Sequence, residues 1–122
     1  MNNKPPLGII KKTGDSYSIE DRITDLYYAD FFIGLSSGLS WLAWAIGTSV
    51  ILISGHSKPW YEPQTDITRI YNPKVCSGCS NETNIIFDKG DWNWCPRNKK
   101  FECTKSISSE MVIDAIDNII AK

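Results

Sequence analysis

The stretch that decides the fold is 31–53, which reads FFIGLSSGLSWLAWAIGTSVILI. It predicts a short apolar strand over 31–33, a turn of small residues over 34–37 and an apolar helix over 39–46. Gly47 stands where a C-terminal helix cap belongs. The continuous apolar run 50–53 is typical of a strand in a parallel sheet that is covered on both faces. Strand, turn, helix and strand make a βαβ unit, so the sequence predicts an α/β fold.

Weaker signals flank this unit. Residues 1–20 are a lead-in punctuated by proline and glycine, in which 7–10 form either a short edge strand or part of a tail. Ile23, Leu26 and Tyr27 recur at helical spacing, which predicts a short amphipathic helix over 21–29. Residues 66–71 and 84–87 are candidate strands.

A last helix is signalled near the end of the chain. Ser108 is a suitable N-cap and Glu110 favours the positive end of the helix dipole. The helix is expected to bury one apolar stripe, formed by Val112, Ile113, Ile116, Ile119 and Ile120. We therefore divide one partial domain into a lead-in (1–20), a βαβ core (21–55), a cysteine-bearing region (56–105) and a C-terminal amphipathic helix (106–122).

Composition narrows the function classes. The chain has 122 residues, of which 42% are hydrophobic and 22% charged, as in ordinary globular domains. The net charge of −1 provides no basic patch for nucleic acid or for an anionic membrane. Residues 31–57 carry no Asp, Glu, Lys or Arg, but glycine and serine clusters divide this run, so we expect no membrane span. The polar start of the chain lacks the apolar core of a secretion signal, which favours a cytoplasmic location.

The four cysteines lie in the region 56–105, with the spacing C-x2-C-x15-C-x7-C. Two thiolates three positions apart can bind one ion from one side, and a second pair completes a tetrahedron; Gly78 would relieve the backbone of the first pair. The predicted ligands are Cys76, Cys79, Cys95 and Cys103. Four protein ligands leave no open position, so the metal would be structural. Four thiolates suit either a zinc ion or a single iron ion, and zinc is the commoner occupant of such sites.

Other states of these cysteines stay open. Two disulfides would also connect the region, although a reducing compartment disfavours them, and free thiols are a third state. Trp92, Trp94 and Phe101 are expected to pack around the site.

The turn between the first strand and the helix, GLSSGLS at 34–40, is a candidate anion site. Backbone N–H groups at a helix N-terminus attract anions, and parallel sheets bind ligands at the carboxyl ends of their strands. Gly38 would let a phosphate approach the backbone, while Ser36, Ser37 and Ser40 can donate hydroxyls. A turn that only packs helix against sheet is the alternative. His56, the only histidine, is expected in a loop near the same cleft, against substrate or solvent.

Together these motifs resemble the bacterial autotransporter O-heptosyltransferases. The resemblance covers roughly 27–120 and is carried by YADFFIGLSSGLSWLAWAIGTSVILISGHSKPW, NPKVCSGCSN, FDKGDWNWCP and FECTKSISSEMVIDAI. It implies a Rossmann-like half of a GT-B glycosyltransferase with an inserted four-cysteine metal finger. This half, the C-terminal one, holds the sugar donor in that family.

The resemblance also implies an activity. Family members transfer heptose from ADP-heptose to serine hydroxyls of autotransporter adhesins in the cytoplasm. By resemblance, Ser36, Ser37, Gly38 and Leu39 face the donor, and the four cysteines bind Fe(III), with Zn²⁺ as the alternative. Family members form large rings, which implies a homo-oligomer here, or a separate N-terminal half as partner.

This sequence departs from the wider heptosyltransferase family in two ways, which limit the residue roles that the resemblance implies for it. Ser36 and Trp41 stand where lipopolysaccharide heptosyltransferases carry an acidic residue and often a histidine. The half that carries the general base and receives the acceptor has no counterpart in these 122 residues. We therefore assign no catalytic residue and expect the chain to be inactive alone. The alternative function is a non-catalytic, metal-clamped module for assembly or interaction.

Overall fold

Three parallel strands form the centre of the protein, in the order β1-β2-β3. They are β1 (Phe32–Leu35), β2 (Val50–Ile53) and β3 (Ile67–Ile70). Phe32 lies opposite Val50, and Val50 lies opposite Ile67. The computed structural model describes residues 8–10, 12, 16–55, 57–82 and 95–121. Within these residues the predicted α/β class and the βαβ unit are confirmed.

Helix α2 (Gly38–Ile46) connects β1 to β2 and ends as the sequence predicts. Gly47 is its C-cap, in the left-handed conformation with φ 95°, and the Gly47 N–H bonds the carbonyls of Ala43 and Trp44. The turn before the helix is shorter than predicted, because β1 continues through Gly34 and Leu35. Gly34 makes room in this strand: a Cβ there would lie 2.5 Å from Cζ of the Phe32 ring.

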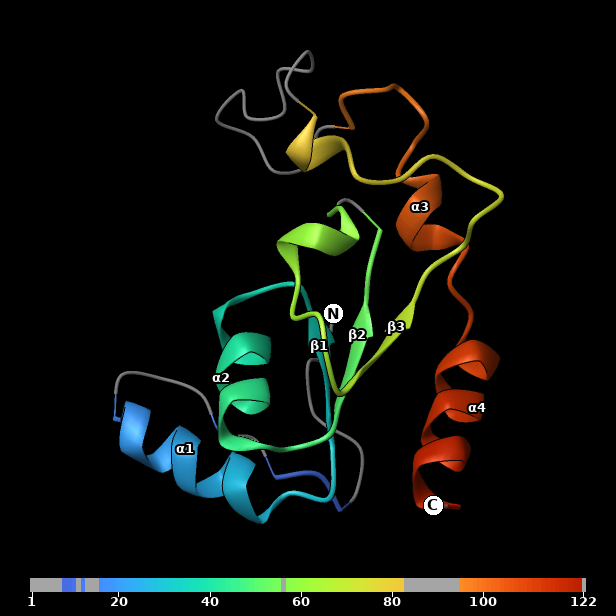
Figure 1. The fold of residues 1–122 in the computed structure, drawn as a ribbon. Helices are drawn as coiled ribbons and strands as arrows, with labels where there is room; N and C mark the ends of the chain where they lie inside the picture. Colours follow the sequence, from blue (N-terminus) through green and yellow to red (C-terminus); the bar gives the residue numbers. More distant parts are fainter. Residues whose placement is uncertain (1–7, 11, 13–15, 56, 83–94, 122) are drawn as a thin grey trace.

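The sheet is covered on both faces, as Figure 1 shows. Helix α2 and helix α1 (Ile19–Tyr28) lie on one side, and helix α4 (Ser109–Ile120) lies on the other. The first side buries Leu26, Ala43, Val50 and Leu52, and the second buries Ile51, Ile70 and Ala115. Successive side chains of a strand point to opposite faces, so β2 must be apolar at every position.

Helix α1 begins two residues before the predicted start. The Ser18 hydroxyl accepts a hydrogen bond from the Asp21 N–H, and the Asp21 carboxylate accepts one from the Ser18 N–H, both at 3.1 Å. This reciprocal capping satisfies two N–H groups that a helix start would otherwise leave unpaired. The S-x-x-D pattern at 18–21 is the signal that the prediction missed.

Helix α4 has its predicted Ser108 cap, but the predicted buried stripe is wrong in part. Ile113 is 53% exposed and Ile120 is 68% exposed, whereas Val112, Ile116 and Ile119 pack against the core around Ala115. The buried face includes Met111 and Ala115 in place of Ile113 and Ile120, which corresponds to a rotation of about 70°. The helix lies against β2 and β3, and Ala115 is buried in one cluster with Ile51 and Ile70.

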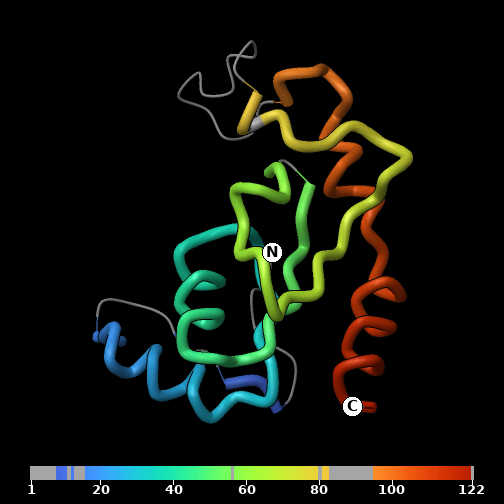
Figure 2. Tube along the Cα trace, in the orientation of Figure 1, coloured from blue at the N-terminus to red at the C-terminus, as the bar shows by residue number. Residues whose placement is uncertain are grey.

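Residues 57–61, 71–82 and 95–105 lie beyond the carboxyl ends of the strands (Figure 1). They hold the short helices η1 (Pro59–Tyr61), η2 (Cys79–Asn81) and α3 (Glu102–Lys105), as Figures 1 and 2 show. Strand β3 confirms the candidate strand at 66–71, and the candidate at 84–87 lies outside the described residues. Residues 8–10 form no strand. No helix in the described part of the chain is both long and apolar enough to cross a bilayer.

Candidate functional site

The predicted donor turn lies at the carboxyl end of β1 and leads directly into α2. Ser36 is half-buried, Ser37 and Gly38 are exposed, and Leu39 is 37% exposed. A Cβ on Gly38 would meet no atom within 4 Å, so the fold itself does not require glycine at this position. The space beside the Gly38 backbone is therefore open to a ligand.

Ser40 takes no part in such a site, contrary to the expectation that its hydroxyl is a donor for a ligand. Its side chain is fully buried. The Ser40 hydroxyl donates to the Ser37 carbonyl at 2.6 Å and accepts from the Ser37 N–H at 3.1 Å. These bonds close the first turn of α2, which leaves Ser36 and Ser37 as the candidate hydroxyl donors.

A hollow of about 430 Å³ adjoins the turn. It is lined by Ile19, Arg22, Gly38, Leu39 and Leu42, so two of the predicted donor residues border it. Arg22 is the one cation in this lining, and its guanidinium lies 5.1 Å from the centre of the Tyr17 ring. A cation beside a helix N-terminus suits an anionic ligand. Sequence analysis missed Arg22 because α1 was read only for its apolar spacing.

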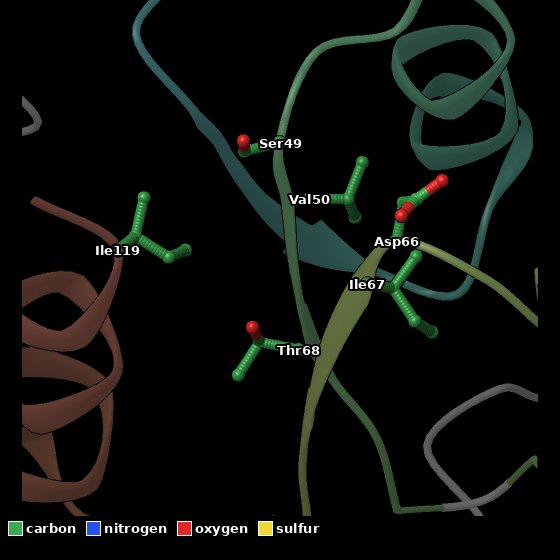
Figure 3. Close-up of a pocket in the computed structure, with 6 residues that line it drawn as sticks. All are labelled: Ser49, Val50, Asp66, Ile67, Thr68 and Ile119. Atoms are coloured by element: carbon green, nitrogen blue, oxygen red, sulfur yellow. The ribbon is translucent and has the colours of Figure 1, made fainter. Parts of the chain in front are cut away.

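A second hollow of about 430 Å³ lies at the opposite, amino ends of β2 and β3. Figure 3 shows Ser49, Asp66 and Thr68 around it, with Ile119 of α4 facing the strands. Ligands of open parallel sheets bind at the carboxyl ends of the strands, so this hollow is not the expected donor site.

The cysteines occupy two segments, 76–79 and 95–103, which meet beyond the carboxyl ends of the strands. The Cys76 N–H donates to Glu102 Oε1 at 3.3 Å, which connects the segments. The Gly78 N–H donates to the Gly55 carbonyl at 2.9 Å. A Cβ on Gly55 would lie 3.3 Å from Cβ of Cys103. The structure thus places segments 76–79 and 95–103 in contact with each other, with Gly78 and Cys103 against the loop that follows β2.

Gly78 has the role predicted for it. Its φ of 75° is in the left-handed region, and a Cβ there would lie 2.5 Å from Cδ of Lys58. The backbone conformation therefore favours glycine between Cys76 and Cys79, whereas the flexible Lys58 side chain can move aside for a larger residue.

All four thiols are free, so the disulfide alternative is not the state of this structure. Burial raises the pKa of Cys76 and of Cys79, and the charge of Cys103 raises the pKa of both further. Burial also acts to raise the pKa of Cys95, but nearby backbone N–H groups outweigh it and lower that pKa. One of them, the Lys99 N–H, donates to Cys95 Sγ at 3.4 Å. Such a cluster of N–H groups stabilises a thiolate.

The chemistry of the cysteines fits a metal ion, whereas the side chains of the described residues are not arranged as a metal site. Cysteine sulfurs are donors that zinc and iron prefer; all four thiols are free, and the pKa of Cys95 is lowered. However, among the described residues no three His, Cys, Asp or Glu side chains form a group that could hold a metal ion. The four-cysteine ligand set stays a prediction. Phe101 is half-buried and contributes its N–H to the Cys95 cluster, while His56, Trp92 and Trp94 lie outside the described residues.

Sequence analysis also missed a buried ion pair at this end of the sheet. Glu62 is the one charged side chain that is buried among the described residues. Arg69 Nε donates to Glu62 Oε1 at 2.8 Å. The two residues stand seven positions apart, in a loop and in a strand, so no periodic pattern predicts their contact.

Comparison with known proteins connects this arrangement to a family. No protein-family model matches the sequence. The chain is 45% identical, over 123 aligned positions, to the autotransporter heptosyltransferase BAHTCr of Citrobacter rodentium; the match covers 98% of this chain and 30% of that protein. It is 38% identical over 103 positions to the inactive autotransporter heptosyltransferase BimC of Burkholderia thailandensis, covering 81% of this chain and 24% of that protein.

The structure is similar to that of TibC, an iron-containing dodecameric glycosyltransferase of enterotoxigenic E. coli. The TM-score is 0.84 at 41% identity, over 98% of this chain and 32% of TibC. A TibC structure in complex with ADP-D-β-D-heptose gives a TM-score of 0.76 at 42% identity, over 84% of this chain and 28% of TibC. The chain spans about 30% of the length of the relatives it matches. In sequence and in structure this chain is similar to the autotransporter heptosyltransferases and corresponds to a C-terminal portion of them.

Proposed function

We propose that this chain supplies the donor-binding part of a cytoplasmic GT-B glycosyltransferase that transfers heptose from ADP-heptose to serine hydroxyls of autotransporter adhesins. One observation carries the proposal: the exposed turn 36–39 stands at the carboxyl end of a parallel strand and at the start of α2, with open space beside Gly38. This is where open α/β sheets hold phosphate-bearing ligands. TibC, which binds ADP-heptose, is 42% identical to this chain.

Each residue of the turn has a distinct part in donor binding. The first N–H groups of α2 and the hydroxyls of Ser36 and Ser37 hold the diphosphate. Gly38 lets the diphosphate approach the backbone, and Leu39 borders the adjoining hollow, where Arg22 supplies a positive charge.

Transfer itself needs more than these residues. The acceptor hydroxyl requires a base, and the reacting groups require a closed cleft that excludes water. The chain matches about 30% of its relatives' length, and none of its residues is assigned as that base. We propose that the chain is inactive alone and acts with a separate N-terminal part or within a homo-oligomer; TibC is a dodecamer.

The four cysteines would hold one structural Fe(III), with Zn²⁺ as the alternative. Bound there, the metal would cross-link segments 76–79 and 95–103, which the described hydrogen bonds connect only sparsely. Support comes from the free thiols, from the N–H cluster at Cys95, and from the iron in TibC.

Thermal unfolding of the purified chain with ADP-heptose tests donor binding. A ligand that binds only the folded state stabilises it by RT ln(1 + [L]/Kd), so the melting temperature rises with the logarithm of ligand concentration once that exceeds Kd. Gly38→Trp should remove this rise because its side chain fills the space beside the turn. Ala45→Trp, which adds the same side chain to an exposed position of α2, should retain it. No rise in the unmodified chain, or an equal rise in Gly38→Trp, contradicts the proposal.

A second candidate function is a non-catalytic module for assembly. The relationship to BimC, an inactive family member, favours it. If this candidate is correct, ADP-heptose should leave the melting temperature unchanged. The mass measured by sedimentation should be far above the 13.8 kDa of the monomer. Transfer of heptose to an adhesin peptide by the purified chain would show that neither the module nor the proposed inactivity is correct.

A further inference from the structure

The Glu62–Arg69 ion pair fixes the loop that follows β2. The Glu62 side chain has no solvent exposure and that of Arg69 is 15% exposed. Ser54, directly after β2, places its hydroxyl 3.1 and 3.0 Å from the two Glu62 carboxylate oxygens. Arg69 Nη2 donates to the Ser57 carbonyl at 3.2 Å. The pair therefore bonds Ser54 and Ser57; these two residues, with Gly55 and Lys58, are called the post-β2 loop.

The post-β2 loop in turn contacts the first cysteine segment at several points. The Gly55 carbonyl accepts from the Gly78 N–H at 2.9 Å, and the Lys58 N–H donates to Asn81 Oδ1 at 2.7 Å. Lys58 Nζ lies 2.8 Å from Glu82 Oε1. The side chain of Lys58 also packs against the backbone of Gly78.

The same loop contacts the second cysteine segment. A Cβ on Gly55 would lie 3.2 Å from the carbonyl oxygen of Cys103 and 3.3 Å from its Cβ, so the two backbones touch. Glu82, which Lys58 holds, also lies 3.5 Å from Arg97 Nη2. One loop is thus the common support of both segments, and a buried pair holds that loop.

We propose that Glu62 and Arg69 are positioning residues that hold the post-β2 loop in the shape on which both cysteine segments rest. They thereby keep the side chains of Cys79 and Cys103 buried. A buried charge is costly unless it is paired, so loss of either partner should release the loop rather than leave the other charge in place. The consequence for metal binding rests on the proposed function, whereas the support of the cysteines by the loop does not.

Alkylation of the metal-free chain under native conditions tests the proposal. Iodoacetamide is added in the absence of denaturant, and modification of Cys79 and Cys103 is followed by peptide mass spectrometry. In Glu62→Gln both thiols should react about tenfold faster, which corresponds to about 1.4 kcal/mol of lost protection. Ser54→Ala and Arg69→Lys, which each remove only part of the network, should show smaller increases and serve if Glu62→Gln does not fold. Unchanged rates in all three variants overturn the proposal.

Two controls separate positioning from general destabilisation. Asp25→Asn makes the same kind of substitution at the exposed Lys12–Asp25 pair and should leave both rates unchanged. Leu26→Ala destabilises the core on the α1 side, away from the loop. If Leu26→Ala accelerates alkylation as much as Glu62→Gln at the same loss of overall stability, the pair is merely structural and the proposal fails.

Zn²⁺ provides a separate readout for the metal. Saturating Zn²⁺ should protect the thiols of the unmodified chain, and Glu62→Gln should need a higher concentration for the same protection. If Zn²⁺ protects neither protein while the metal-free rates still differ, the metal-site proposal fails and the positioning role stands. Equal Zn²⁺ protection and equal metal-free rates in both proteins refute the positioning role.

Discussion

Gly47→Ala is expected to destabilise the protein through backbone conformation alone. Gly47 has φ 95°, and a Cβ there would meet no atom within 4 Å, so no steric clash with the rest of the protein contributes. An L-residue in the left-handed region costs about 1–2 kcal/mol. Alanine recovers about 0.4–1 kcal/mol by restricting the unfolded chain, which leaves a net loss of about 1 kcal/mol. With an unfolding entropy of about 2.1 cal/mol/K per residue, the melting temperature should fall by about 4 °C.

Two variants make this prediction sharp when thermal unfolding is followed by circular dichroism. Gly47→Asn should lose less than Gly47→Ala, because asparagine tolerates the left-handed region better. Gly38→Ala, at the other end of α2, also meets no atom within 4 Å but needs no positive φ, so it should keep or raise the stability. A Gly47→Ala protein as stable as the unmodified chain, or a Gly38→Ala protein that loses as much, would refute the reasoning.

Two further predictions concern packing, and urea unfolding measures both. Ile51→Ala should cost about 2–5 kcal/mol because Ile51 is fully buried under α4, while Ile113→Ala, at a 53% exposed site, should change stability by no more than about 0.5 kcal/mol. Equal losses would show that α4 is buried on a different face. Trp44→Phe should cost about 1 kcal/mol, because it removes the hydrogen bond from Nε1 to the Thr65 carbonyl at 2.8 Å; no loss would mean that water replaces this bond without penalty.

Much of the fold could be predicted because its signals are local. Gly47 marks a helix end by its freedom at positive φ, and Ser108 marks a helix start by its hydroxyl. The apolar run of β2 predicts burial on both faces, which α2 and α4 provide. The face that α4 buries was predicted wrongly, because five apolar residues fit two faces of one helix and only contact with β2 and β3 selects between them.

The candidate site also has features that the sequence predicts and features that it does not. The cysteine spacing correctly predicts that Gly78 is favoured where the chain turns, and the turn 36–39 lies where a βαβ unit places it. Ser40 was wrongly assigned to the anion site. Its hydroxyl bonds the backbone of Ser37, three residues earlier, and the residue type alone does not show which partner a hydroxyl takes. Arg22 borders the hollow beside the turn only because α1 packs beside α2.

The βαβ unit, the C-terminal end of α2, the start of α4 and the family resemblance could be predicted from the sequence, because each depends on residues near one another in the chain. Tertiary structure alone decided that Glu62 meets Arg69, that Gly55 touches Cys103, and that both cysteine segments share one supporting loop. These contacts join residues of different segments, and the desolvation of a charge or the approach of two backbones exists only once the segments are packed together.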